Sequence, residues 1–339
     1  MKIQEHVILK DYTTFKIGGP ARFFCIVKNE DDLIEAFNFS KKNKIKMFVI
    51  GGGSNLLIAD AGYDGMVIKM DISGKKYIEE GDFVKVTAGA GENWDKLVEE
   101  TVEKGLYGLE NLSNIPGTVG ATPVQNIGAY GSEAKDVIES VYVLDIIKDE
   151  YKTLTNVECD FDYRDSFFKK NPQQYIIISV TFKLNKKGKL NFNYKDIQEA
   201  LSAKKIKNPN LKQMREIIID IRNRKLPNLK TYGTAGSFFK NVIVSSIKAK
   251  ELLDKYPEMI VHAVNNKKTK IPLAWILDHV CGFRGVKKGN VGTYQNQALV
   301  LINYGNANAK EIIDLAQKMV DKVYEETGIE IEPEVEYLE

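Results

Sequence analysis

The stretch GLENLSNIPGTVGATPVQNIGAYG, residues 108–131, has a composition that suits neither a regular helix nor a regular strand. From Ile115 onwards it is rich in Gly, Ala and Pro and carries no charged side chain. Small residues let a flat ligand approach the backbone closely. Gln125 and Asn126 add amide donors and acceptors, which suit a heterocycle with carbonyl and imide edges. We interpret residues 115–131 as a loop that holds a flat ring, with a packed turn of small residues as the alternative.

A second glycine-rich stretch, GGGSN at 51–55, lies between the strand patterns MFVI and LLIAD. Its three glycines permit positive φ angles and bring several N–H groups together, and such concave arrays bind phosphate oxygens. Leu56 stands where a Rossmann fingerprint has its third glycine, and no P-loop motif is present. A plain tight turn is the alternative. A phosphate loop together with a ring loop suggests a nucleotide-like cofactor of flavin size.

The composition is that of a globular protein with a sizeable core, because 43% of the 339 residues are hydrophobic and 28% are charged. A net charge of +2 is too small to indicate nucleic-acid or membrane-surface binding, and we expect neither a nucleic-acid partner nor membrane insertion. Apolar runs are too short for a signal peptide or a membrane span. The cysteines Cys25, Cys159 and Cys281 are widely spaced, which predicts reduced thiols without a metal or a disulfide framework. We therefore expect a cytoplasmic protein.

Strand and helix patterns alternate along the chain, which predicts a mixed α+β fold. The segment 30–43 begins with acidic residues and ends with lysines, as the helix dipole favours. The segment 210–225 places Leu211, Met214, Ile218 and Ile221 on one helical face. The chain closes with an amphipathic helix over 309–327 and a last strand, IEIEPEVEY, over 329–337.

These motifs together resemble the family of UDP-N-acetylenolpyruvoylglucosamine reductases (the MurB family), and in particular its first subtype, which has an added tyrosine-bearing loop. The resemblance covers nearly the whole chain in the family's order. Val242 departs from the family, which often has proline there, and we expect only a local backbone effect. Besides 108–131, the resemblance rests on TTFKIGGPA (13–21), GGGSNLL (51–57), AGAGENW (88–94), FDYRDSFFK (161–169), AGSFFKN (235–241), QALVLIN (297–303) and EPEV (332–335).

The resemblance implies a two-lobed FAD-binding domain of the vanillyl-alcohol-oxidase (PCMH) type, with lobes at 1–75 and 76–205. A smaller α+β substrate-binding domain would follow at 206–339, and its last strand would carry a catalytic glutamate back to the active site. The FAD pyrophosphate would lie on 51–55 and the isoalloxazine ring along 116–131. The cofactor-binding residues would be Gly51, Gly52, Gly53, Ser54, Asn55, Pro116, Gly117, Gly120, Gln125, Asn126, Gly128, Ala129 and Gly131.

The family's activity implies that NADPH reduces the FAD, which then reduces UDP-N-acetylglucosamine enolpyruvate to UDP-N-acetylmuramate during synthesis of peptidoglycan precursors. No separate nicotinamide motif is recognisable, so NADPH comes from the resemblance alone. Ser237 matches the family's proton donor, Arg164 the arginine at the reacting carboxylate, and Glu334 the catalytic glutamate of E-P-E-V. The chain would be a monomer whose partner is the UDP-sugar. The substrate would be held by Tyr194, Lys225, Asn241 and Gln297.

Ser237 is not expected to be a nucleophile, because the G-x-S-x-G pattern is absent and the chain has only three histidines, His6, His262 and His279, to act as its base. A hydroxyl is a weak acid, yet a developing carbanion is a strong base, so proton transfer can proceed within hydrogen-bond reach. A strand serine bonded to the backbone is the alternative.

The other candidate residues have structural alternatives as well. Arg164 could hold a carboxylate by two parallel bonds, or pair with Asp162 and Asp165 at the surface. Glu334 could donate a hydrogen bond to the developing enolate, or belong to the wet face of an edge strand. Lys225 could be a solvated helix end. Two other functions stay open, namely an FAD-dependent oxidase of the same superfamily and a non-catalytic nucleotide-sugar binding protein.

Overall fold

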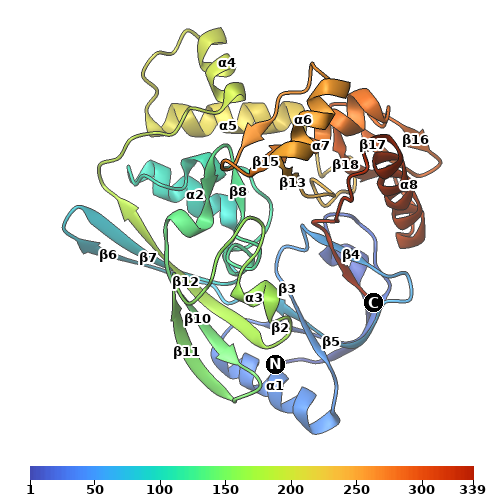
Figure 1. Cartoon of the computed structure of the whole chain (residues 1–339). Helices are drawn as coiled ribbons and strands as arrows, with labels where there is room; N and C mark the ends of the chain where they lie inside the picture. The colour runs from blue at the N-terminus through green and yellow to red at the C-terminus, as the bar shows by residue number, and fades with distance from the viewer. The chain divides into compact units, whose positions relative to one another are not determined.

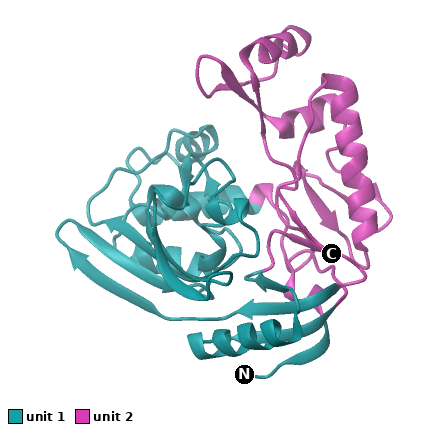
Figure 2. Ribbon diagram, turned by 60° about the horizontal axis from the view of Figure 1, so that its bottom comes forward, with its two compact units in different colours: residues 1–7, 21–52, 63–223 teal, residues 8–20, 53–62, 224–339 magenta.

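The computed structural model describes all 339 residues, which form two compact units (Figure 2). The first unit comprises residues 1–7, 21–52 and 63–223, and the second comprises 8–20, 53–62 and 224–339. The chain passes from the first unit to the second inside the GGGSN loop, between Gly52 and Gly53. The division into lobes at residue 75 stays a prediction.

A four-stranded sheet opens the first unit, in the order β1-β2-β5-β3. The inner strand β5 pairs in parallel with both β2 and β3. Helix α1 spans the predicted range, and its N-cap Asn29 accepts a hydrogen bond from the Asp32 N–H at 2.8 Å. The elements are β1 (Gln4–Ile8), β2 (Pro20–Val27), α1 (Glu30–Asn43), β3 (Met47–Ile50) and β5 (Tyr63–Met70).

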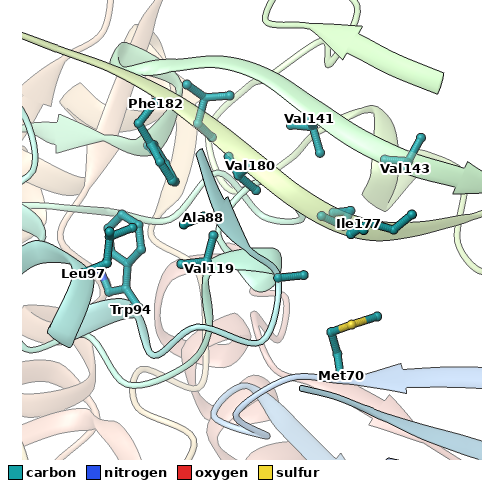
Figure 3. Packing of buried hydrophobic residues seen from close by; sticks show 14 of the residues in the cluster. Met70, Ala88, Trp94, Leu97, Val119, Val141, Val143, Ile177, Val180 and Phe182 are labelled. Carbon is teal, nitrogen blue, oxygen red and sulfur yellow. The ribbon is translucent and has the colours of Figure 1, made fainter. Parts of the chain in front are cut away.

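A second sheet of the first unit is antiparallel, in the order β11-β10-β12-β7-β6 (Figure 1). Its inner face packs on Trp94, which is 1% exposed and lies 5.8 Å from Phe182 between ring centroids (Figure 3). The indole N–H donates to the Leu112 carbonyl at 2.9 Å, so the largest core side chain also anchors the segment before the ring loop. The strands are β6 (Lys75–Glu80), β7 (Phe83–Gly89), β10 (Ile138–Asp145), β11 (Glu150–Thr155) and β12 (Tyr175–Asn185).

Helix α5 confirms the helix predicted from apolar spacing, because Leu211, Met214, Ile218 and Ile221 are all buried. All but Leu211 join a small core cluster with residues of α4. The other elements of this unit are α2 (Trp94–Glu103), α3 (Phe167–Lys170), α4 (Lys195–Ala203), α5 (Leu211–Lys225), β8 (Gly128–Ala129), β9 (Ser132–Glu133) and the 3-10 turns Glu110–Leu112, Val119–Ala121 and Ala134–Asp136.

The second unit has its own core, which helix α8 shares with β17 and β18. Strand β19 pairs in parallel with β4, so the chain end lies beside the strand that follows the GGGSN loop. The elements are a 3-10 turn (Leu9–Tyr12), β4 (Leu56–Ile58), β13 (Val242–Ser245), α6 (Ser246–Lys255), β14 (His262–Ala263), β15 (Lys268–Ile271), α7 (Leu273–Trp275), a π-helix (Ile276–Val280), β16 (Lys287–Lys288), β17 (Val291–Tyr294), β18 (Gln297–Asn303), α8 (Ala309–Thr327) and β19 (Glu336–Leu338).

The last strand is shorter than predicted, because only Glu336–Leu338 forms a regular strand. The apolar side chains before it are still buried, as the alternation indicated, and include Ile329, Ile331 and Val335. Pro333 has no N–H to donate, and it makes only an isolated bridge to Phe239. No helix in the structure combines the length and the apolar character that a membrane crossing requires.

Candidate functional site

The two glycine-rich loops meet in the first unit. A Cβ atom on Gly51 would lie 2.3 Å from the Thr118 Oγ1, and one on Gly52 would lie 2.7 Å from the Gly117 Cα. Real Cβ atoms do not come as close to a backbone atom as a Cβ on Gly52 would, so glycine at position 52 is what lets these loops approach each other, and a side chain on Gly51 would displace the Thr118 hydroxyl. The structure therefore brings together the loops predicted for the phosphates and for the flat ring.

The ring loop also packs tightly onto the segment AGAGENW. A Cβ on Gly120 would lie 2.6 Å from the Ala90 Cβ, and the Gly120 N–H donates to the Ala90 carbonyl at 2.9 Å. Thr118, at the junction of the two loops, is 7% exposed, and its buried hydroxyl has no hydrogen-bond partner. A cradle without side chains and with an unused polar atom fits a flat, phosphate-bearing cofactor such as FAD.

The side-chain amide of Asn126 is bonded inside the protein, and its predicted contact with the cofactor stays a prediction. It is fully buried, with φ of 45°, and its Nδ2 donates to Glu133 Oε2 at 2.9 Å and to the Asp162 carbonyl at 3.0 Å. Its Oδ1 accepts from the Lys135 N–H at 2.9 Å. The amide is thus used inside the protein, where it shapes the loop, whereas its neighbour Gln125 is half-buried.

Arg164 contacts the ring loop from outside it. It occupies a tight turn in which Asp162 and Asp165 exchange backbone hydrogen bonds, and it has φ of 54°. Its Nη2 donates to the Gly128 carbonyl at 2.7 Å. The predicted carboxylate-binding arginine and the predicted cofactor loop are therefore adjacent, and this contact orients the guanidinium fork.

Tyr194 packs against the end of the same loop, with its ring centroid 5.4 Å from that of Tyr130 at an angle of 85°. Burial raises the pKa of Tyr130 to about 12, so its phenol stays protonated at neutral pH. Asn111 is 1% exposed and donates from Nδ2 to the carbonyls of Tyr130, at 3.0 Å, and Asn191, at 2.8 Å. These bonds hold the segment 191–194, which carries Tyr194, beside the end of the ring loop.

A cluster of charged residues just before the ring loop was not predicted from the sequence. Arg215 binds Asp95 through two bonds of 2.6 and 3.0 Å, and Asp95 also accepts from the Asn114 N–H at 2.5 Å. Arg222 donates from Nε to the Asn114 carbonyl at 3.0 Å, and burial lowers its pKa. One feature of the sequence could have indicated this cluster. Arg215 and Arg222 are seven residues apart, so they lie on the same side of α5 as its apolar residues.

In the second unit, Ser237 lies on an extended segment between two others. Ser237 bridges to Val300 of β18, and the Phe238 N–H donates to the Leu299 carbonyl at 2.8 Å. On the other side, the Glu334 N–H donates to the Phe238 carbonyl at 2.7 Å. The structure thus places the predicted proton donor and the predicted catalytic glutamate on neighbouring segments. Ser237 is partly exposed, and its hydroxyl makes no hydrogen bond to the backbone.

Glu334 differs from the other glutamates of the chain end. Glu330, Glu332 and Glu336 are exposed, as expected of the wet side of an edge, whereas Glu334 is half-buried. Its backbone carbonyl accepts a hydrogen bond from the Asn55 Nδ2 at 2.9 Å. Glu334 is thus less exposed than the other three glutamates, and its catalytic role stays a prediction.

The remaining glycine of the GGGSN loop is also sterically required. Gly53 has φ of 60°, and a Cβ on it would lie 2.0 Å from the Tyr12 carbonyl oxygen. Its carbonyl accepts from the Thr14 N–H at 3.0 Å. Ser54 and Asn55 follow it, and both are half-buried. Residues 53–55 of the loop belong to the second unit, which also carries Ser237.

A hydrogen bond links the chain segments that carry two of the predicted substrate residues, Gln297 and Lys225. Asn296, which precedes Gln297, donates from Nδ2 to the carbonyl of Arg224, which precedes Lys225, at 2.8 Å. The turn between β17 and β18 thereby holds the C-terminal end of α5. Asn241 lies apart from this bond and accepts from the Leu273 N–H at 3.2 Å, at the start of α7.

Comparison with known proteins places these features in one family. An FAD-binding domain family matches residues 21–150, and the C-terminal domain of UDP-N-acetylenolpyruvoylglucosamine reductase matches residues 228–338. The reductase of Flavobacterium johnsoniae is 43% identical over 99% of each chain, and that of Pseudomonas aeruginosa is 38% identical over 98% of each. The relatives therefore match both the ring-loop region and the Ser237 region.

A solved structure gives the same result for the fold. The UDP-N-acetylenolpyruvylglucosamine reductase of Thermus caldophilus aligns over 100% of both chains, with a TM-score of 0.70 and 25% sequence identity. Together with the match to an FAD-binding domain, this likeness confirms the predicted α+β fold, with an FAD-binding domain and a separate C-terminal domain.

Proposed function

The chain belongs to the UDP-N-acetylenolpyruvoylglucosamine reductase family, and from this premise we propose how its residues carry out the reaction. It is an FAD-dependent oxidoreductase of peptidoglycan precursor synthesis. We assign NADPH as the reductant and UDP-N-acetylmuramate as the product. We further propose that it acts as a cytoplasmic monomer without nucleic-acid partners, in keeping with three free cysteines and a net charge of +2.

The cofactor is held by the loops that only glycine can build. The N–H groups of the GGGSN loop suit the diphosphate, and the uncharged ring loop suits the isoalloxazine. Asn126 contributes by holding the ring loop in shape, since its amide is already bonded inside the protein. When bound, the flavin supplies the hydride that adds to the double bond of the enolpyruvyl group.

Ser237 delivers the proton in this proposal. When hydride adds to the terminal carbon of the double bond, the π electron pair of that bond moves to the carbon beside the carboxylate. The Ser237 hydroxyl gives its proton to that carbon, and the serine oxygen regains a proton from solvent. The hydroxyl has no backbone partner to give up before it does so, which supports the proton-donor role over that of a structural strand serine.

Arg164 and Glu334 deal with the negative charge of the reacting group. Arg164 holds the substrate carboxylate by its guanidinium fork, which its bond to the Gly128 carbonyl already orients. Glu334 donates a hydrogen bond to the developing enolate. Tyr194, Lys225, Asn241 and Gln297 bind the UDP-sugar, and the bond between Asn296 and Arg224 links the chain segments that carry Gln297 and Lys225.

One observation carries this assignment, namely the hydrogen bond from the Glu334 N–H to the carbonyl of Phe238, next to Ser237. It joins the chain segments that carry Ser237 and Glu334, the two residues to which the proposal gives complementary roles, although they lie far apart in the sequence.

A single-turnover experiment tests the proposal. Photoreduced protein is mixed anaerobically with UDP-N-acetylglucosamine enolpyruvate, and the return of oxidised flavin absorbance is followed. We expect rapid return in the wild type and a rate about 100-fold to 10,000-fold lower in Ser237→Ala, with flavin reduction by NADPH unchanged. A wild-type rate in Ser237→Ala would exclude the proton-donor role. Protein purified without flavin would indicate a binding protein, and rapid oxygen consumption without the enolpyruvyl substrate would indicate an oxidase.

A further inference from the structure

Lys69 is a charged residue inside the central strand of the parallel sheet. Its neighbours Met66, Val67 and Ile68 are fully buried and Met70 is 2% exposed, whereas Lys69 is half-buried. In the register it lies opposite Ile26 of β2 and Ile50 of β3. It therefore stands at the carboxyl end of β5, beside the carboxyl end of β3, where ligands of parallel sheets commonly bind.

The Lys69 ammonium contacts the first glycine of the GGGSN loop. Its Nζ donates to the Gly51 carbonyl at 2.6 Å, and no carboxylate lies within ion-pair distance of it. Burial lowers the pKa of Lys69, and Asp71 opposes that effect only through its charge. A half-buried cation without a carboxylate at ion-pair distance is unfavourable, so the protein alone compensates this charge only in part.

The contact also determines how one peptide group of the loop is oriented. In a trans peptide the carbonyl and the following N–H point in opposite directions. Because the Gly51 carbonyl is turned toward Lys69, the Gly52 N–H is turned away from it. Without a side chain at either glycine, nothing of the loop itself covers that N–H, which suits an acceptor such as a phosphate oxygen.

We propose that Lys69 is a positioning residue for the FAD pyrophosphate, which it serves by orienting the Gly51–Gly52 peptide and by compensating the phosphate charge across that peptide. This inference rests on the placement of the pyrophosphate at residues 51–55 in the proposed function. It concerns the negative charge of the cofactor and makes no statement about the flavin ring.

The test compares FAD binding to flavin-free protein for the wild type, Lys69→Met and Lys69→Arg, by titration of flavin fluorescence at several salt concentrations. We expect Lys69→Met to weaken FAD binding about tenfold to a hundredfold, since hydrogen bonds to charged groups are the stronger ones. The salt dependence of binding should also be smaller in Lys69→Met. Lys69→Arg, which keeps the charge, should retain most of the affinity. The control is Lys46→Met, because Lys46 is exposed just before β3 and its loss changes the net charge equally.

Thermal unfolding separates positioning from a purely structural role. We expect flavin-free Lys69→Met to melt at or above the wild-type temperature, because methionine removes a half-buried charge that the protein compensates only in part, while the stabilisation by added FAD becomes smaller. A lower melting temperature without FAD would assign Lys69 to the fold alone and overturn the proposal. Unchanged FAD affinity in Lys69→Met would overturn it as well. If even the wild type does not bind FAD, the proposed function fails instead.

Discussion

Asn55 donates a hydrogen bond from its side-chain amide to the backbone carbonyl of Glu334, at 2.9 Å. Its own carbonyl accepts from the Glu336 N–H at 3.0 Å, and from there β19 pairs with β4 in parallel. The last residue of the GGGSN loop therefore holds the segment that carries the proposed catalytic glutamate. Asn55, which the sequence predicts to bind the cofactor, therefore also positions Glu334.

Replacing Asn55 by alanine tests this link. We expect Asn55→Ala to lower kcat about tenfold at saturating substrate, because the Glu334 carbonyl loses its donor and the segment becomes less well positioned. The free energy of unfolding should fall by about 1 kcal/mol, the usual contribution of one hydrogen bond. Steady-state kinetics and thermal unfolding measure both effects. Asn290→Ala, at an exposed position of the same unit, is the control. A wild-type kcat in Asn55→Ala would show that Glu334 needs no support from Asn55.

Arg164→Lys tests whether fork geometry, in addition to charge, matters beside the ring loop. Lysine keeps the positive charge but cannot make two parallel bonds to a carboxylate. We expect kcat/KM for the enolpyruvyl substrate to fall about a hundredfold, which corresponds to roughly 2.7 kcal/mol. Reduction of the flavin by NADPH should stay within about threefold. Arg22→Lys, at an exposed arginine of the same unit, is the matched control. If kcat/KM is unchanged in Arg164→Lys, the carboxylate does not bind at Arg164.

Local sequence patterns predicted the elements well where neighbours along the chain decide the structure. The segment 30–43 has an N-cap, acidic residues in its first turn and lysines in its last, and it forms a helix over that range. The apolar spacing of 210–225 likewise predicted α5. The strand predicted over 329–337 is mostly irregular, because Pro333 interrupts the ladder whatever the alternation of apolar residues suggests.

The site was predictable only in part, since motifs name residues but not the partners of those residues. Asn126 belongs to a matching motif, yet its amide is bonded to Glu133 and to backbone groups that spacing along the chain does not reveal. Arg215 reads as a surface charge of an amphipathic helix until its bond to Asp95 is seen. Lys69 likewise stands as an isolated charge inside an apolar strand. Its contact with Gly51, in the loop that follows another strand, cannot be predicted from spacing along the chain.

Tyr194→Phe separates the hydroxyl of this residue from its ring. The ring contacts Tyr130 edge to face, so phenylalanine should keep this packing and leave the melting temperature unchanged. If the hydroxyl binds the substrate diphosphate, KM for the enolpyruvyl substrate should rise about tenfold, the usual loss for one hydrogen bond to a charged group, while kcat changes little. Tyr194→Ala should raise KM further, because it also removes the ring. An unchanged KM in Tyr194→Phe would remove this tyrosine from the substrate site.

The ion pair between Asp95 and Arg215 predicts a pH dependence of stability. Burial opposes ionisation of Asp95, but the hydrogen bonds from Arg215 and from the Asn114 N–H outweigh it and lower the pKa of Asp95. A carboxylate whose pKa is lower in the folded state stabilises the fold above the pKa of the unfolded state, which is about 3.9 for aspartate. This contribution is lost as the pH falls from there through the lower pKa of the folded state.

Asp95→Asn should therefore be less stable than the wild type by about 2–3 kcal/mol at pH 7, because Arg215, which is 7% exposed, loses its main partner. The difference should shrink as the pH falls below about 4, since the wild type then loses the same pair. Urea unfolding at pH 7, 5, 4 and 3 measures it. Asp31→Asn, at an exposed residue of α1, should show no such pH-dependent difference. A constant difference between Asp95→Asn and the wild type at every pH would mean that asparagine disturbs packing and that ionisation of Asp95 adds nothing. Asp95 also accepts a hydrogen bond from the Asn114 N–H, just before the ring loop. Because Asp95→Asn should weaken this bond, we expect the variant to bind FAD less tightly, which provides a second readout.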